Sequence, residues 1–187
     1  WYRSRGLGDV YKRQVWGSII TIFMLALALG YLLGGRLSTR TPSATIYGLF
    51  FVGAALFALP IILLADSIMR PIMIYIEDAR YGSLFASIFL FFIPTSILGM
   101  ISPYSVRLMV DKEEHSGHMA GLLYFISTLG SALGTLGTSF YFVLWYEVNQ
   151  ILWGAVISLV LAGVAVLFFE NTMKADVTVG SGGYAKK

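Results

Sequence analysis

The sequence predicts an all-α fold, a polytopic bundle of about five transmembrane helices. Of the 187 residues, 57% are hydrophobic and 12% are charged, whereas soluble domains average roughly 45–50% apolar and about 25% charged residues. A membrane-spanning helix needs roughly 20 mostly apolar residues, and five stretches of the chain have that length. They are 15–35, 46–65, 82–106, 119–143 and 150–169.

The positions of the ionisable residues support this assignment. Asp, Glu, Lys, Arg and His are absent from all five stretches and cluster at their ends, as expected when a charge at the bilayer centre costs on the order of 3 kcal/mol. The apolar runs are long and do not alternate, which favours helices over the strands of a barrel. We also expect a short interfacial helix within residues 66–81.

The orientation follows from the rule that Lys and Arg concentrate in cytoplasmic loops. Residues 1–14 are left out of this comparison, because SRGLGDVYKRQ resembles a peptide encoded by sequencing-library adaptors; we expect this segment to be non-native or disordered. The membrane domain is then 15–169, and 170–187 is a flexible cytoplasmic tail or linker. The basic residues assigned to the cytoplasm are Arg36, Arg40, Arg107, Lys112, Lys174, Lys186 and Lys187, against Arg70 and Arg80 on the other side.

The composition argues against several classes of function. A formal charge of +3 is too small and too scattered to indicate nucleic-acid binding, and the absence of cysteine excludes disulfides and thiolate metal sites. His115 and His118 lie three residues apart beside Glu113 and Glu114, but this loop is charged and solvated. We therefore assign no catalytic, cofactor-binding or metal-ligating residue, and expect no cofactor. Whether the chain belongs to an enzyme stays open.

Small residues recur at four-residue spacing in the first stretch. Ala26, Gly30 and Gly34 share one helix face, and small residues at this spacing let two helix backbones approach closely. They predict a packing seam. The glycine-rich end of this helix, followed by Arg36 and Arg40, resembles the cytoplasmic loop between helices two and three of major facilitator transporters, although the acidic residue of that family is absent.

The third and fourth stretches carry the polar residues from which we derive a candidate site. Pro94 and Pro103 interrupt the third stretch. They indicate either a broken helix that forms a polar pocket, as in secondary transporters, or a helix that bends to fit its neighbours. Hydroxyls on one face of the fourth stretch predict helix packing, with a substrate face as the alternative. The candidate cleft between the two comprises Thr95, Ser96, Ser102, Tyr104, Tyr124, Thr128, Ser131 and Thr135, with Arg36 and Arg107 at its cytoplasmic mouth.

Three blocks together resemble the membrane domain of spermidine synthase-like proteins, also described as fused major-facilitator/spermidine synthases. The first block consists of two segments, VWGSII beginning at Val15 and LGYLLGGRL beginning at Leu29. The second block is PTSILGMISPYSVRL, which begins at Pro94, and the third is AGLLYFISTLGSALG, which begins at Ala120. The resemblance covers about residues 15–169. It implies one more helix before Val15, so the chain would be truncated at both ends and the complete domain would have six helices.

The resemblance also implies a function. Many such proteins continue into a cytoplasmic aminopropyltransferase-like domain, none of which is present in this chain. We therefore expect an integral membrane module that anchors or serves a polyamine-related domain, in the inner (plasma) membrane of a prokaryote with the C-terminus in the cytoplasm. The expected partners are the lipid bilayer, a fused or associated synthase-like domain, other copies through helix–helix contacts, and no nucleic acid. The alternative is a fragment of a major-facilitator-type small-molecule transporter.

Overall fold

The computed structural model describes residues 2–40, 42–76, 78–109 and 116–182, and this part of the chain is helical without strands. Five helices are long and apolar enough to cross a membrane, which confirms the predicted all-α class. Each of these spans overlaps one of the five predicted stretches. The spans are Lys12–Arg40, Ala44–Leu63, Arg80–Met109, Gly117–Trp145 and Val148–Glu170.

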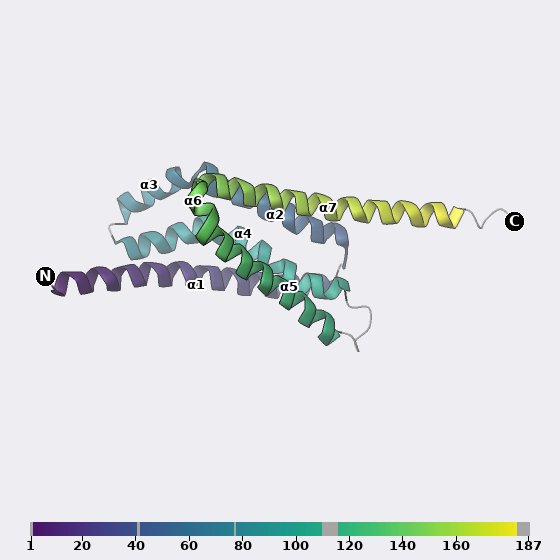
Figure 1. Cartoon of the computed structure of the whole chain (residues 1–187), viewed down its shortest axis with the longest axis horizontal. Helices are drawn as coiled ribbons and strands as arrows, with labels where there is room; N and C mark the ends of the chain where they lie inside the picture. Colours follow the sequence, from purple (N-terminus) through teal and green to yellow (C-terminus); the bar gives the residue numbers. More distant parts are fainter. Residues whose placement is uncertain (1, 41, 77, 110–115, 183–187) are drawn as a thin grey trace.

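The helices form a layer with one further helix laid across it. In chain order the elements are α1 (Tyr2–Arg40), α2 (Ala44–Leu63), α3 (Ala65–Tyr75), α4 (Ala79–Met109), α5 (Ser116–Gly137), the π-helical turn η2 (Thr138–Phe142), α6 (Val143–Trp145) and α7 (Val148–Gly182). The helices α1, α4, α2 and α7 lie side by side in that order, and α5 crosses in front of α4 (Figure 1). The short helix expected within residues 66–81 is α3.

The first and last helices extend beyond the predicted spans. Helix α1 begins at Tyr2, within the segment 1–14 that we expect to be non-native or disordered, and α7 continues to Gly182, within the expected flexible tail. Residues 171–179 contain no glycine or proline, so a helix nucleated in the apolar span meets no strong helix breaker there. The rest of the expected tail, 183–187, lies outside the described residues.

The predicted glycine seam of α1 packs against α4. Ala26 is fully buried, and a Cβ added at Gly30 would overlap the carbonyl oxygen of Ser96. A Cβ at Gly34 would lie 2.6 Å from both the Cα and the carbonyl oxygen of Met100. The two backbones therefore touch, which is the close approach that small residues permit, and the predicted seam is confirmed.

A second glycine contact joins α2 to α7. A Cβ added at Gly163 would lie 2.7 Å from Cγ2 of Val52 and 3.0 Å from the carbonyl oxygen of Gly48. Gly48 faces the same contact from the other side, because a Cβ there would lie 2.9 Å from Cγ of Leu167. Both outer pairs of the layer are thus held by backbone-to-backbone proximity.

Helix α4 is continuous through both of its prolines. Pro94 and Pro103 lie inside the single helix Ala79–Met109, so of the two interpretations left open by the sequence the structure has the unbroken helix. After each proline a hydroxyl bonds back to a carbonyl of the preceding turn: Ser96 donates to the carbonyl of Phe92 at 2.8 Å and Ser105 to that of Ile101 at 2.6 Å. Membrane helices tolerate proline when neighbouring groups and local adjustments satisfy the carbonyls that it frees.

Polar contacts tie α2, α4 and α7 together at one end of the layer, and α1 also ends there, at Arg40, shortly before α2 begins. Ser43 caps α2, its hydroxyl accepting the amide of Thr45 at 3.2 Å, and the Thr45 hydroxyl donates to the Glu170 carboxylate of α7 at 2.7 Å. The fully buried Tyr104 of α4 bonds to Ser43 as well. The end of α1, the start of α2, the end of α4 and the end of the α7 span therefore lie together; we call this the Arg36 end.

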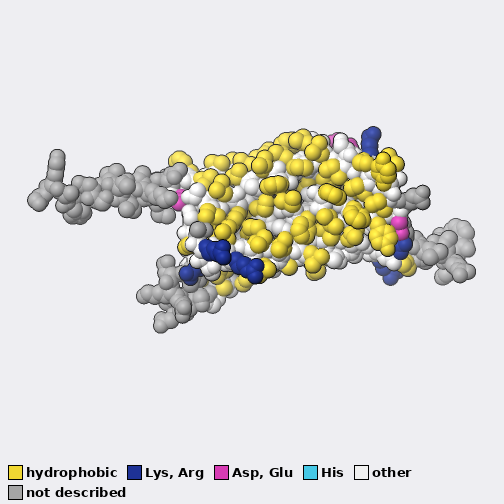
Figure 2. Space-filling view, turned by 180° about the vertical axis from the view of Figure 1, so that it is seen from behind, with side chains coloured by type: hydrophobic (Ala, Val, Ile, Leu, Met, Phe, Trp, Pro, Cys, Tyr) yellow, Lys and Arg dark blue, Asp and Glu magenta, His cyan; other side chains and the backbone are white. Residues whose placement is uncertain are grey.

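The surface of the layer is largely apolar. Trp16, Phe89, Leu144 and Phe168 are each at least 66% exposed, and hydrophobic side chains cover the middle of the molecule while basic and acidic ones lie near its ends (Figure 2). An apolar surface this extensive is unfavourable in water and is what lipid chains would cover. The structure is therefore compatible with a multi-pass membrane protein.

Candidate functional site

A cleft separates α5 from the layer behind it. Its volume is about 380 Å³, and helices α1, α2, α4 and α5 all contribute to its walls. The contribution of α4 comes from residues 98–105, where α5 crosses it. The walls are lined by Leu27, Tyr31, Tyr47, Leu98, Gly99, Ile101, Ser102, Ser105, Leu123, Ile126 and Ser127.

The polar groups of this cleft are all hydroxyls. Tyr31, Tyr47, Ser102, Ser105 and Ser127 supply them, and none of the lining residues carries a charge. The hydroxyls of Tyr47 and Ser105 are hydrogen-bonded to each other, with their oxygens 2.8 Å apart. Hydroxyls can both donate and accept, so the cleft can orient a neutral polar group of an otherwise apolar molecule.

The predicted site residues of α4 do not all reach this cleft. Ser102 lines it. Thr95 and Ser96 are buried, and Ser96 uses its hydroxyl within its own helix. The structure therefore places one of these three residues in the cleft and the other two inside the packed layer.

Tyr104 has a packing environment that explains its burial. Its hydroxyl accepts the Ser43 amide at 2.9 Å and donates to the Ser43 carbonyl at 3.1 Å. Its ring stacks on Tyr47, with centroids 6.1 Å apart, and meets Phe50 edge to face at 5.2 Å. Tyr104 thus satisfies the backbone before α2 and supports Tyr47 from behind, without lining the cleft itself.

The predicted residues of α5 lie on its open flank. Thr128, Ser131 and Thr135 line a second hollow of about 550 Å³, while Tyr124 is 57% exposed. Ser127 borders both hollows, so the hydroxyls of α5 form a strip that leads from its flank into the cleft. The eight predicted residues are therefore divided among the cleft, this strip and the packed interior.

Four hydroxyl residues of the cleft are absent from the predicted site. Tyr31 comes from α1, Tyr47 from α2, Ser105 from α4 and Ser127 from α5. Tyrosine is a polar exception within a span that is otherwise apolar, and this was the available signal for the first two. It does not reveal which neighbouring helix the ring faces.

The two arginines predicted at the cytoplasmic mouth lie at the Arg36 end but do not line the cleft. Arg36 lines a separate hollow with Arg40, and Arg107 is exposed in the last turn of α4. The two arginines therefore lie at the same end of the molecule, but they do not form a wall of the cleft.

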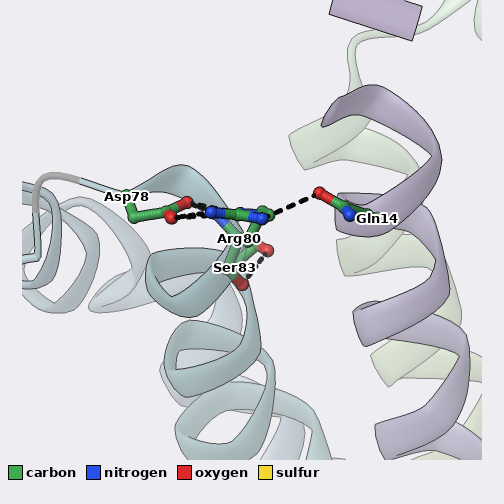
Figure 3. A network of polar contacts seen from close by, with 4 residues as sticks. All are labelled: Gln14, Asp78, Arg80 and Ser83. Atoms are coloured by element: carbon green, nitrogen blue, oxygen red, sulfur yellow. Dashed lines mark hydrogen bonds and ion pairs between the residues drawn. The ribbon is translucent and has the colours of Figure 1, made fainter. Parts of the chain in front are cut away.

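A polar network lies at the opposite end, where α4 begins. The carboxylate of Asp78 accepts the backbone amide of Arg80 at 3.0 Å and pairs with its guanidinium. The same guanidinium donates to the side-chain oxygen of Gln14 on α1 at 3.2 Å, and the Ser83 hydroxyl donates to the Arg80 carbonyl (Figure 3). These bonds cap α4 and join it to α1, so the network is structural.

The fold and the cleft define a class of protein, an all-α bundle of membrane-span helices with an uncharged internal cleft. They do not lead to a particular family. No family model matches the chain, and no curated protein or solved structure matches it either.

Proposed function

We propose that this chain is the integral membrane module of a spermidine synthase-like protein and that it anchors or serves a cytoplasmic aminopropyltransferase-like domain. The observation that carries the proposal is the packing of the first two blocks of the resemblance. The block that includes Gly30 and Gly34 forms the seam with the block that includes Ser96 and Met100. Two regions that carry the resemblance and lie far apart in the sequence therefore form one helix–helix contact, as expected if the resemblance reflects a shared membrane fold.

The placement of the last helix is consistent with an anchoring role. Glu170 accepts a hydrogen bond from Thr45 at the Arg36 end, so α7 leaves its span at the end that also holds Arg36, Arg40 and Arg107. By the positive-inside rule this end faces the cytoplasm. Helix α7 then continues to Gly182, in the direction in which a cytoplasmic domain would follow.

The chemistry of the cleft favours anchoring over polyamine transport. A polyamine carries several positive charges, and such charges within a membrane are normally paired with acidic side chains. The cleft offers hydroxyls and apolar side chains instead.

Reporter fusions test the orientation on which the proposal depends. A reporter fused after Lys187 should be active in the cytoplasm, and one inserted after Tyr75, between α3 and α4, should be active outside it. The second fusion is the control, since it must give the opposite result if both proteins insert correctly. A C-terminal reporter outside the cytoplasm would contradict the proposal.

The cleft itself favours one alternative, a fragment of a major-facilitator-type transporter for a small neutral molecule. Transport would be detected as uptake of labelled solutes by liposomes containing the purified chain. Ser102→Leu would fill the cleft and abolish this uptake, whereas Ser158→Ala, on an exposed face of α7, would not change it. If the chain is an anchor, neither it nor its variants will move the solutes.

A further inference from the structure

A small hollow beside the end of α1 combines basic and apolar side chains. Its volume is about 350 Å³, and its lining is Leu33, Arg36, Leu37 and Arg40 from α1 with Met100 from α4. The four α1 residues follow the spacing i, i+3, i+4, i+7, which places them on one helix face. The hollow is therefore a groove along α1, closed on one side by α4.

The groove is charged at the membrane face and apolar further in, which is the order of the headgroup and the acyl chains in a phospholipid. The α1 span ends at Arg40, so both arginines lie in its last turns, at the membrane face, and Leu33 lies deeper. At a rise of about 1.5 Å per residue, Arg36 and Arg40 are separated by about 6 Å along the helix axis, and Leu33 lies about 4.5 Å further in than Arg36. Charge is thus placed at the depth of headgroups and apolar surface at the depth of acyl chains.

Within the part of the chain that the structure describes, both guanidinium groups can be reached by an anion. Arg36 and Arg40 are exposed, and Figure 2 shows basic side chains gathered at the left-hand end of the molecule beside the hydrophobic surface. Among the residues that the structure describes, no hydrogen bond or ion pair joins either guanidinium to a carboxylate. Guanidinium groups bind phosphate oxygens through two parallel hydrogen bonds.

We propose that this groove binds an anionic phospholipid, with the headgroup phosphate held between Arg36 and Arg40 and an acyl chain lying against Leu33, Leu37 and Met100. A free phosphate would satisfy the arginines but leave the apolar part of the groove uncovered. A second copy of the chain docked symmetrically here would bring two pairs of arginines together, and like charges repel. Basic pockets between membrane helices are suited to anionic lipids.

Lipid selectivity of the purified full chain tests this assignment. The chain is reconstituted with a trace of spin-labelled phosphatidylglycerol or spin-labelled phosphatidylcholine, and the protein-bound fraction of each lipid is measured by electron paramagnetic resonance. The test variant is Arg36→Gln/Arg40→Gln. The matched control is Arg70→Gln, which removes an exposed arginine from α3 without touching the groove.

We expect the unmodified chain and the Arg70→Gln control to prefer phosphatidylglycerol. At about 1 kcal/mol for each arginine near the membrane surface, the double variant should lose roughly thirtyfold in relative affinity. Arg36→Lys/Arg40→Lys should keep part of the preference, because the charge remains and the planar fork is lost. Since all these side chains are exposed, far-UV circular dichroism should show the same helix content in every variant.

Three results would overturn the proposal. The first is an unchanged preference in the double glutamine variant, and the second is an equal loss in the Arg70→Gln control, which would indicate a general effect of net charge. The third is displacement of the labelled lipid by millimolar inorganic phosphate, which would show that the arginines recognise a free anion without the groove.

Discussion

The glycine seam between α1 and α4 allows a sharp test of the packing, because two adjacent glycines of α1 differ in their surroundings. A Cβ at Gly34 would lie 2.6 Å from backbone atoms of Met100, whereas a Cβ at Gly35 would have nothing within 4 Å. Gly34→Ala therefore requires the two helices to separate, while Gly35→Ala requires no movement.

The size of the effect can be worked out from these distances. Ordinary contact begins at 3.4 Å, so α1 and α4 must move apart by about 0.8 Å beside Gly34, and the obstructing atoms are backbone that cannot rotate away. Overpacking of this kind costs typically about 1–3 kcal/mol. Both variants gain the same helix propensity, about 1 kcal/mol. The difference between Gly34→Ala and Gly35→Ala therefore isolates the packing cost.

We expect Gly35→Ala to be as stable as the unmodified chain or slightly more stable, and Gly34→Ala to be less stable than Gly35→Ala by about 1–3 kcal/mol. The measurement is equilibrium unfolding of the full chain in mixed detergent micelles, followed by far-UV circular dichroism. Equal stability of the two variants would refute the close approach at Gly34, and a lower stability of Gly35→Ala would reverse the assignment of faces.

Two further predictions concern other contacts in the layer. Gly163→Ala should destabilise the α2–α7 contact by about 1–2 kcal/mol in the same unfolding assay, while Gly154→Ala on the same helix should not, because a Cβ there meets nothing within 4 Å; identical results for both would contradict the contact. Tyr104→Phe removes the two hydrogen bonds to Ser43 and should lower stability by about 1–3 kcal/mol, because the half-buried Ser43 amide loses its partner, although the Ser43 carbonyl keeps the amide of Tyr47; an unchanged unfolding midpoint would show that water replaces the hydroxyl.

Much of the fold could be predicted because lipid imposes simple constraints on sequence. A charged side chain within the bilayer is costly, so uninterrupted apolar runs mark the spans directly. The face of a helix follows from spacing, so Ala26, Gly30 and Gly34 indicate a seam. The partner of that seam does not follow, because a close contact needs a residue from each of two helices that are distant in sequence.

The same reasoning explains what sequence analysis missed in the layer and in the site. Gly48 and Gly163 do not belong to a repeat of small residues such as the one in α1, so neither indicates a seam by itself. Their role is visible only when α2 and α7 are packed together, because the two glycines lie on either side of one contact. Thr95 and Ser102 are seven residues apart and so lie on nearly the same helix face, yet Ser102 lines the cleft and Thr95 is buried. The difference arises because α5 crosses α4 obliquely, and the crossing angle depends on packing that spacing alone does not specify.

The most direct test of the proposed function is to sequence the gene outward through both ends of this reading frame. We predict that the frame continues past Lys187 into residues that encode a strand, a glycine-rich loop and a helix, the start of an aminopropyltransferase-like domain joined to α7. A stop codon directly after Lys187, with no gene for such a domain beside it, would contradict the anchoring account and favour a stand-alone membrane protein.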